Sequence, residues 1–201
     1  MEKRKKKELD FRRKHIIDAA RTVFAENGFT ETTIEQIAAS AEIARATLYK
    51  IFPTKEELYL CVVEDVFEGI CVVAQQTMDR DVPLKQKLEE YVHQALQHFS
   101  SQSGFVKVLI HQVNKLNIGV DGRKRITRIH DRLNDIIADA IRLGIKRKEI
   151  RPIDADRAMR VFNHMIYGYE MNNLIRPDSP EVRKQAVQFI IDIFFNGIVK
   201  R

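Results

Sequence analysis

The sequence predicts an all-α fold of about nine helices, with a small N-terminal domain followed by a larger one. Apolar residues recur at intervals of three and four along most of the 201 residues, which is the spacing of one helix face. All five prolines, at 53, 83, 152, 177 and 180, fall between these apolar segments, so none interrupts a helix interior. The expected helices span residues 10–27, 33–40, 44–51, 54–79, 82–101, 104–117, 122–148, 154–175 and 180–199.

Composition and motifs exclude several classes of protein. A hydrophobic content of 44% is enough to bury a substantial core. The sequence has no run of about 18 apolar residues and no apolar stretch behind its basic N-terminus, so we expect neither a membrane span nor a signal peptide, and a cytoplasmic location. Cys61 and Cys71 lie ten residues apart on one expected helix, about 15 Å by helical rise, and are predicted to be separate buried thiols. No catalytic, metal-ligand or phosphate-loop motif occurs, so we expect no enzyme activity, cofactor or metal.

Residues 32–57 have the pattern of two short helices joined by a tight turn and followed by a third helix. Ile34, Ile37, Ala38 and Ala41 form one narrow apolar face. Either Thr33 with Gln36 or Thr32 with Glu35 makes a capping box at the first helix start. The second helix, at about 44–51, is polar outside. Such a unit offers one helix to a DNA groove.

The exposed residues of that second helix suit phosphates and base edges. Arg45 supplies a forked cation and Lys50 a point charge, while Thr47 and Tyr49 supply hydroxyls. Lys55 stands at the next helix start, where a cation opposes the helix dipole unless an anion such as a phosphate is present. The predicted DNA-binding residues are Thr33, Arg45, Ala46, Thr47, Tyr49, Lys50 and Lys55.

Residues 14–62 resemble the DNA-binding domain of the TetR family of bacterial transcriptional regulators. The resemblance rests on Ala19-Ala20, Phe24, Gly28-Phe29, Thr33, Ile37-Ala38, Thr47-Leu48-Tyr49, Phe52 and Lys55-Glu56. It implies a DNA-binding domain over residues 1–52 and an effector-binding and dimerisation domain over 53–201. It also implies a homodimeric repressor that binds a pseudo-palindromic operator and is released by a small, largely apolar effector. The alternatives are a helical partner-binding module with a vestigial DNA domain, or an all-helical enzyme.

Two positions depart from the family pattern. Glu42 stands in the turn where the family usually has glycine, and a non-glycine residue forced to positive φ costs on the order of 1 kcal/mol. Ala44 replaces the usual serine or threonine, so the second short helix lacks a side-chain N-cap, a loss of about 1 kcal/mol. Both changes affect the placement of that helix rather than the fold.

The N-terminal arm is strongly basic. Residues 1–14 hold eight lysines and arginines against three acidic residues, a net charge of +5. The arm would either reach phosphates or a minor groove, or form a solvated tail.

The last helix carries two apolar stripes, which one covering surface cannot bury. Coverage on two sides is expected from a four-helix bundle between two subunits, with burial inside one chain as the alternative. The predicted dimer interface is Ile191, Phe194, Phe195 and Ile198.

Helices 82–101 and 154–175 bring aromatic residues to core spacing. The resemblance implies that such helices enclose an apolar cavity for the effector, while plain core packing is the alternative. The predicted effector pocket is Tyr91, His98, Phe99, His130, Phe162 and Tyr169.

Overall fold

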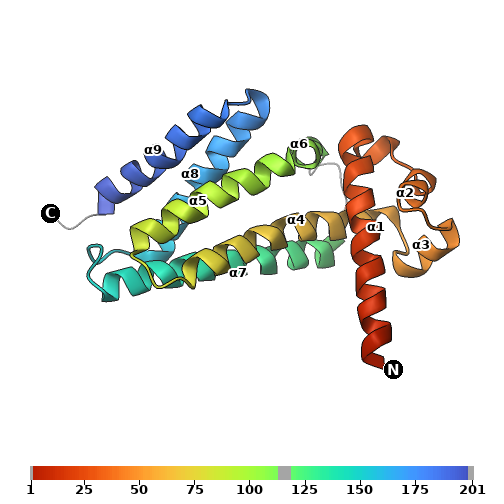
Figure 1. Ribbon diagram of the computed structural model, residues 1–201, viewed down its shortest axis with the longest axis horizontal. Coiled ribbons are helices and arrows are strands. Elements are labelled where there is room, and N and C mark those ends of the chain that lie inside the picture. The colour runs from red at the N-terminus through yellow and green to blue at the C-terminus, as the bar shows by residue number, and fades with distance from the viewer. Residues whose placement is uncertain (1, 113–118, 199–201) are drawn as a thin grey trace. The chain divides into compact units, whose positions relative to one another are not determined.

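The computed structural model describes residues 2–112 and 119–198, and all regular structure in these ranges is helical (Figure 1). The predicted all-α fold is therefore confirmed. Residues 113–117 of the expected sixth helix lie outside the described ranges, which contain no helix long and apolar enough to cross a membrane. The helices are α1 (Glu2–Glu31), α2 (Ile34–Ser40), α3 (Arg45–Ile51), α4 (Lys55–Met78), α5 (Leu84–Ser101), α6 (Ser103–Gln112), α7 (Gly119–Lys146), α8 (Ala155–Ile175) and α9 (Pro180–Ile198).

The helices form two compact units, neither of which is one continuous stretch of sequence. Unit 1 comprises residues 1–67 and 102–126, and unit 2 comprises residues 68–101 and 127–201. The long helices α4 and α7 therefore contribute to both units. The functional division expected at residue 52 falls within unit 1 and stays a prediction.

Unit 1 is built around an aromatic cluster. The ring of Tyr59 on α4 lies 5.0 Å from Phe24, 5.0 Å from Phe29 and 5.3 Å from Phe105, measured between centroids. Gly28 interrupts α1 with φ of 76°, a conformation that glycine adopts without penalty, just before Phe29. The cluster thereby joins α1, α4 and α6.

Unit 2 has a dense core in which aromatic rings again meet. Phe162 of α8 lies 6.3 Å from Tyr91 of α5 and 4.7 Å from Phe194 of α9, measured between ring centroids. A Cβ atom added to Gly69 of α4 would overlap the His98 ring, so glycine is what allows this imidazole to lie against the helix backbone. Helices α4, α5, α8 and α9 are therefore in close contact within this unit.

The helix α9 has two apolar faces, but the predicted interface residues are on the inner one. Ile191, Phe194 and Phe195 are buried in the core of their own subunit, packed against α5 and α8. The side chain of Ile198 lies outside the described residues. These three side chains are therefore covered by their own subunit, and their assignment to a dimer interface stays a prediction. The outer face carries Val182, Phe189 and Ile193, which are exposed.

Two helix ends adopt the same left-handed turn without a glycine. Glu42 after α2 has φ of 52°, and Lys148 after α7 has φ of 61°. At the first turn, the Glu42 and Ile43 amides donate to the Ala39 and Ala38 carbonyls at 3.1 and 3.0 Å. This hydrogen-bond pair defines a Schellman motif, which normally places glycine at the left-handed position. The expected strain at Glu42 is present.

Replacing Glu42 with glycine should raise the free energy of unfolding by on the order of 0.5 to 1 kcal/mol. Relief of the left-handed penalty, about 1 to 2 kcal/mol, outweighs the extra chain entropy that glycine loses on folding. Urea denaturation followed by circular dichroism measures the change. Lys148→Gly should shift stability in the same direction, whereas Ala39→Gly inside α2 should lower it. Destabilisation by Glu42→Gly would contradict the strain.

Candidate nucleic-acid interface

The helix α3 turns two side chains inward and the others outward. Leu48 and the C-capping residue Phe52 are fully buried. Residues 45, 46, 47, 49 and 50 lie within one continuous arc around the axis of this seven-residue helix. The exposed residues are Arg45, Ala46, Tyr49 and Lys50, and Thr47 is half-buried. Five of the predicted DNA-binding residues therefore share the accessible side of α3.

Arg45 is held in place by two neighbours. Its Nη1 lies 2.5 Å from Oε1 of Glu35 on α2, and its Cζ lies 5.3 Å from the centroid of the Tyr49 ring. Both members of the ion pair are more than half exposed, and such pairs contribute about 0 to 1 kcal/mol. The guanidinium can therefore exchange Glu35 for a base edge or phosphate at little cost.

Of the two possible capping boxes, the structure forms the one made by Thr33 and Gln36. The Thr33 hydroxyl accepts from the Gln36 amide at 3.2 Å, and the Thr33 amide donates to the Gln36 side chain at 2.8 Å. Thr32 instead donates its hydroxyl to the Gly28 carbonyl at 2.6 Å. Since the exposed Thr33 hydroxyl only accepts in this box, its own hydrogen can be donated to a phosphate.

Lys55 contacts the protein itself. Its Nζ donates to the carbonyl oxygens of Phe29 and Thr32 at 2.8 Å each, and to Thr30 at 3.3 Å. The same atom lies 4.5 Å from the centroid of the Phe29 ring. In the protein alone the Lys55 cation is therefore paired with backbone carbonyls, and its phosphate contact stays a prediction. Its cation satisfies carbonyls at the end of α1 and just after it, where no further helical turn supplies donors and positive charge is favourable.

The start of α3 is open, as the sequence predicts. Ala44 occupies the N-cap in extended conformation without a side-chain hydrogen bond, and only its backbone carbonyl joins the first turn, accepting from Thr47 at 2.8 Å. The helix is held in place by its buried side chains rather than by a cap.

A set of ion pairs that the sequence did not reveal attaches α1 to α4. Asp65 accepts from Lys14 at 2.6 Å and from Arg21 at 2.5 Å. Arg13 places Nη2 2.9 Å from the Cys61 sulfur and its Cζ 4.5 Å from the Phe52 ring centroid. Because 39 to 51 residues separate these partners, no local spacing rule could have paired them.

Both cysteines are buried free thiols, as predicted. Burial raises the pKa of the Cys61 thiol, although the charge of Arg13 and a hydrogen bond from Arg125 act in the opposite direction. The same cause raises the pKa of the Cys71 thiol. Both are therefore protonated at neutral pH.

The residues predicted for an effector pocket lie in the core of unit 2, at its edge and on the surface. Tyr91 and Phe162 are buried against each other in the core, while Phe99 and Tyr169 are half-buried at its edge. The Tyr169 hydroxyl donates to Asp178 at 2.6 Å. The other two members are His98, half-buried against α4, and His130, exposed on α7. The assignment of these six residues to one effector pocket stays a prediction.

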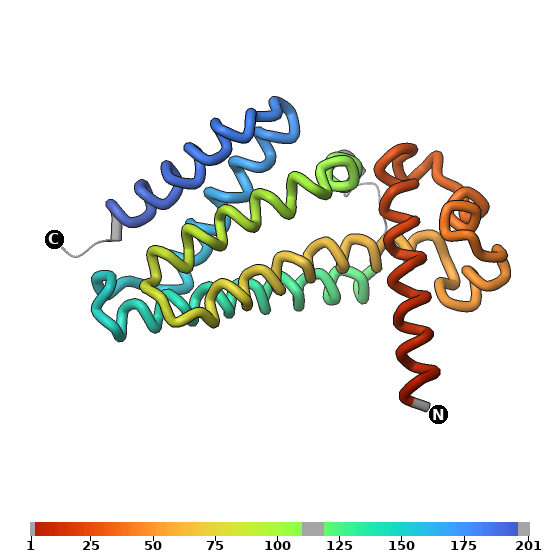
Figure 2. The backbone as a smooth tube through the Cα atoms, viewed as in Figure 1, coloured from red at the N-terminus to blue at the C-terminus, as the bar shows by residue number. Residues whose placement is uncertain are grey.

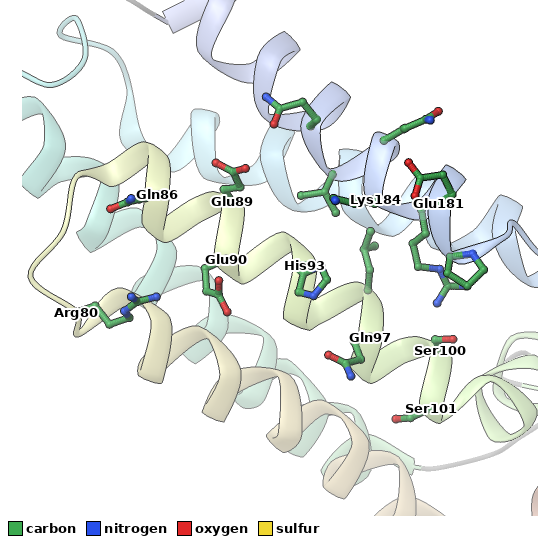
Figure 3. A pocket seen from close by; sticks show the side chains of 16 residues that line it. Arg80, Gln86, Glu89, Glu90, His93, Gln97, Ser100, Ser101, Glu181 and Lys184 are labelled. Carbon is green, nitrogen blue, oxygen red and sulfur yellow. The ribbon is translucent and has the colours of Figure 1, made fainter.

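A hollow lined largely by residues with polar or charged side chains lies between α5 and α9 (Figure 3). It measures about 1060 Å³ and includes His93 and Gln97 from α5, with Arg183 and Lys184 from α9. None of the six predicted effector residues belongs to its lining. Sequence periodicity could not have located it, because its two walls come from helices about 90 residues apart.

Comparisons with known proteins agree with this geometry. Residues 16–62 match the model of the bacterial regulatory proteins of the tetR family. The fatty acid metabolism regulator protein of Bacillus subtilis is 26% identical over 155 residues, or 76% of each chain. The HTH-type transcriptional repressor KstR2 of Mycobacterium tuberculosis is 24% identical over 96% of each chain. The crystal structure of a putative TetR-family transcriptional regulator from Mesorhizobium loti, 17% identical, has a TM-score of 0.78 over 96% of this chain and 98% of that one.

A helix-turn-helix with an exposed, cationic second helix, followed by further helices, defines a DNA-binding regulator of transcription. The matched segment contains α2 and α3, together with the C-terminal half of α1 and the first two turns of α4. Residues 16–62 carry the DNA-binding domain of the tetR family of bacterial regulatory proteins. Members of this family regulate transcription and are not enzymes.

Lys55 and Lys50 should respond differently to alanine substitution. Lys55→Ala should lower the free energy of unfolding by about 1.5 to 3 kcal/mol, because it removes a charged donor from three carbonyls. Lys50→Ala should leave stability within about 0.5 kcal/mol. The salt dependence of DNA affinity should fall in Lys50→Ala but not in Lys55→Ala. The expected change in Lys50→Ala is about 0.9 in the slope of log K against log salt. Denaturation and fluorescence anisotropy distinguish the two; a stable Lys55→Ala protein with a reduced slope would restore the phosphate contact.

Proposed function

We propose that this regulator is a homodimeric repressor that binds a pseudo-palindromic operator through α3 and is released by a small, largely apolar effector. The exposed face of α3, with Arg45, Ala46, Tyr49 and Lys50 together, carries the proposal. A helix presented in this way fits the major groove, whose base edges and flanking phosphates these side chains can contact.

Different residues have different roles in this proposal. Arg45 reads a guanine, because its forked guanidinium can donate to both O6 and N7. Lys50, Tyr49, Thr47 and Thr33 hold phosphates and so fix the register of α3 on the duplex. Ala46 has no polar group and allows close approach of the helix to a base or a thymine methyl group.

The outer apolar face of α8 and α9 supports dimerisation. Phe189 is 66% exposed and Ile193 48%, and on α8 Val161 is 58% exposed. The ring centroids of Phe162 on α8 and Phe194 on α9 are 4.7 Å apart. The preceding residues, Val161 and Ile193, therefore lie at similar heights along the two helices. A second copy related by a two-fold axis would cover these side chains in a four-helix bundle. Two recognition helices about 34 Å apart would then enter successive major grooves.

The relatives and the edge of the unit 2 core support an apolar effector. The Bacillus subtilis relative regulates fatty acid metabolism. In this chain the half-buried side chains of Phe99 on α5 and Tyr169 on α8 pack against the edge of the core. An apolar ligand could take their place there without separating side chains that are fully buried. The polar groove between α5 and α9 would instead suit a hydrophilic ligand.

Arg45→Ala should weaken operator binding by about 1 to 3 kcal/mol and relax the preference at one position in each half-site. Selection from a random DNA library by wild type and variant measures both effects. Lys50→Ala is the matched control, since loss of a phosphate contact should weaken binding without changing the selected sequence. Identical base preferences for wild type and Arg45→Ala would remove the base-reading role.

Phe189→Asp should dissociate the dimer while leaving the subunit folded, because the side chain is exposed in the single chain. Phe194→Asp should instead unfold it, because an unpaired charge would enter the core. Sedimentation with circular dichroism separates the two results. A wild-type protein that is monomeric at micromolar concentration would exclude the two-fold model.

A saturated fatty acid series should contain ligands that weaken operator binding by a factor of about 5 to 150, with the operator weakening ligand binding by the same factor. Phe99→Ala and Tyr169→Ala should reduce this response, whereas Gln97→Ala in the polar groove should not. Calorimetry with free and operator-bound protein measures the coupling. Equal ligand affinity in both states would disprove release by this class of effector.

A further inference from the structure

We propose that the first turns of α1, carrying Lys3, Arg4, Lys5, Lys6 and Lys7, bind the phosphate backbone of the DNA that flanks the segment contacted by α3. The inference rests on the proposed operator binding and adds a second, sequence-independent contact to it. The partner is double-stranded DNA, recognised by its charge alone.

The basic residues of α1 divide into two groups. From residue 12 onward they have partners inside the protein: Arg12 pairs with Glu8 at 2.9 Å, and Lys14 and Arg21 pair with Asp65. Arg13 lies over Phe52. Lys3 to Lys7, in contrast, are all exposed, and none pairs with a carboxylate whose position the structure describes. Five adjacent positive charges are therefore left for an external partner.

The position of these charges is unfavourable for the protein alone. Cations at a helix N-terminus oppose the dipole, and Lys3 and Lys7 form a like-charged pair four residues apart; each effect costs a few tenths of a kcal/mol or more. A row of phosphates would remove both costs. Successive side chains are 100° apart around a helix, so these five point in all directions from the helix axis. Some of them would therefore face a nearby duplex whichever way α1 is turned about its own axis.

The basic turns are continuous with the DNA-reading surface. Arg13 contacts Phe52, the C-capping residue of α3. Lys6 precedes Arg13 by seven residues, which places it on nearly the same face of α1 and about 10 Å further along the axis. Within unit 1, the N-terminal turns of α1 extend past α3 (Figure 2). A duplex on α3 would thus have these lysines near its flank.

An acidic membrane surface is a poorer match for the same charges. A helix that lies in a membrane interface needs a continuous apolar face. The exposed apolar residues near this end are Leu9 and Phe11, at 53% and 75% exposure, and they point about 160° apart because they are two residues apart on a helix. DNA requires no such face.

The test compares two variants of the full-length protein with equal loss of charge. In the first, all five residues from Lys3 to Lys7 are replaced by glutamine, which preserves helix propensity. The matched control carries glutamine at five other exposed basic positions of α7 and the turn after it. These are Arg123, Lys124, Arg128, Lys146 and Lys148. Circular dichroism checks that both remain folded.

Affinity is measured against salt concentration on a duplex selected by the wild type, in a short form and with added flanking DNA. In the first variant, the slope of log K against log salt should fall in magnitude by about 0.9 for each phosphate contact removed. This variant should bind the flanked duplex at least tenfold more weakly than the wild type does. Its affinity should be the same for the short and the flanked duplex. Its base preference should not change. The control should behave as wild type.

An unchanged slope in the first variant, or an equal loss in both variants, would overturn the proposal while leaving operator recognition intact. Salt-sensitive binding to phosphatidylserine vesicles that needs Lys3 to Lys7, with DNA binding unaffected, would overturn it in favour of a membrane. Failure of the wild type itself to bind any duplex would overturn both this inference and the proposed function.

Discussion

The Lys55 ammonium group, bound to the carbonyl end of α1, is the contact on which the presentation of α3 depends. It connects the start of α4 to the carbonyls of Phe29 and Thr32, and Tyr59, one turn later, packs on Phe24 and Phe29. The helices α2 and α3 lie between these two attachment points in the sequence. Because α3 is only seven residues long and uncapped, its position depends on these neighbours rather than on its own stability.

The two strained or uncapped positions lie next to α3, while the surrounding contacts are well satisfied. Glu42 adopts a left-handed conformation and Ala44 provides no cap. In contrast, both hydrogen bonds of the Thr33 capping box are present, and Leu48 and Phe52 are fully buried. Local strain of about 1 kcal/mol is tolerated when tertiary packing over-determines the backbone. The helix α3 is thus placed by packing.

Charge on α1 serves two purposes along its length. Near Asp65, lysine and arginine attach the helix to α4. At the N-terminal end the charges have no such role and remain available to a polyanion. Lysine and arginine therefore stabilise the fold in one part of α1 and are available to bind DNA about three turns earlier. The two groups of cations differ only in whether acidic side chains lie beside them.

The sequence by itself determined the all-α fold, the helix-turn-helix and the residues that face outward on α3. In the described residues it also placed the helix limits to within a few positions, except at the N-terminal extension of α1. These depend on periodicity and capping, which act over three or four residues. Tertiary structure alone decided that Lys55 binds α1, that Phe194 faces inward while Phe189 faces outward, and that His130 is exposed. Periodicity shows that a face is apolar, but the neighbour that covers it comes from residues distant in sequence.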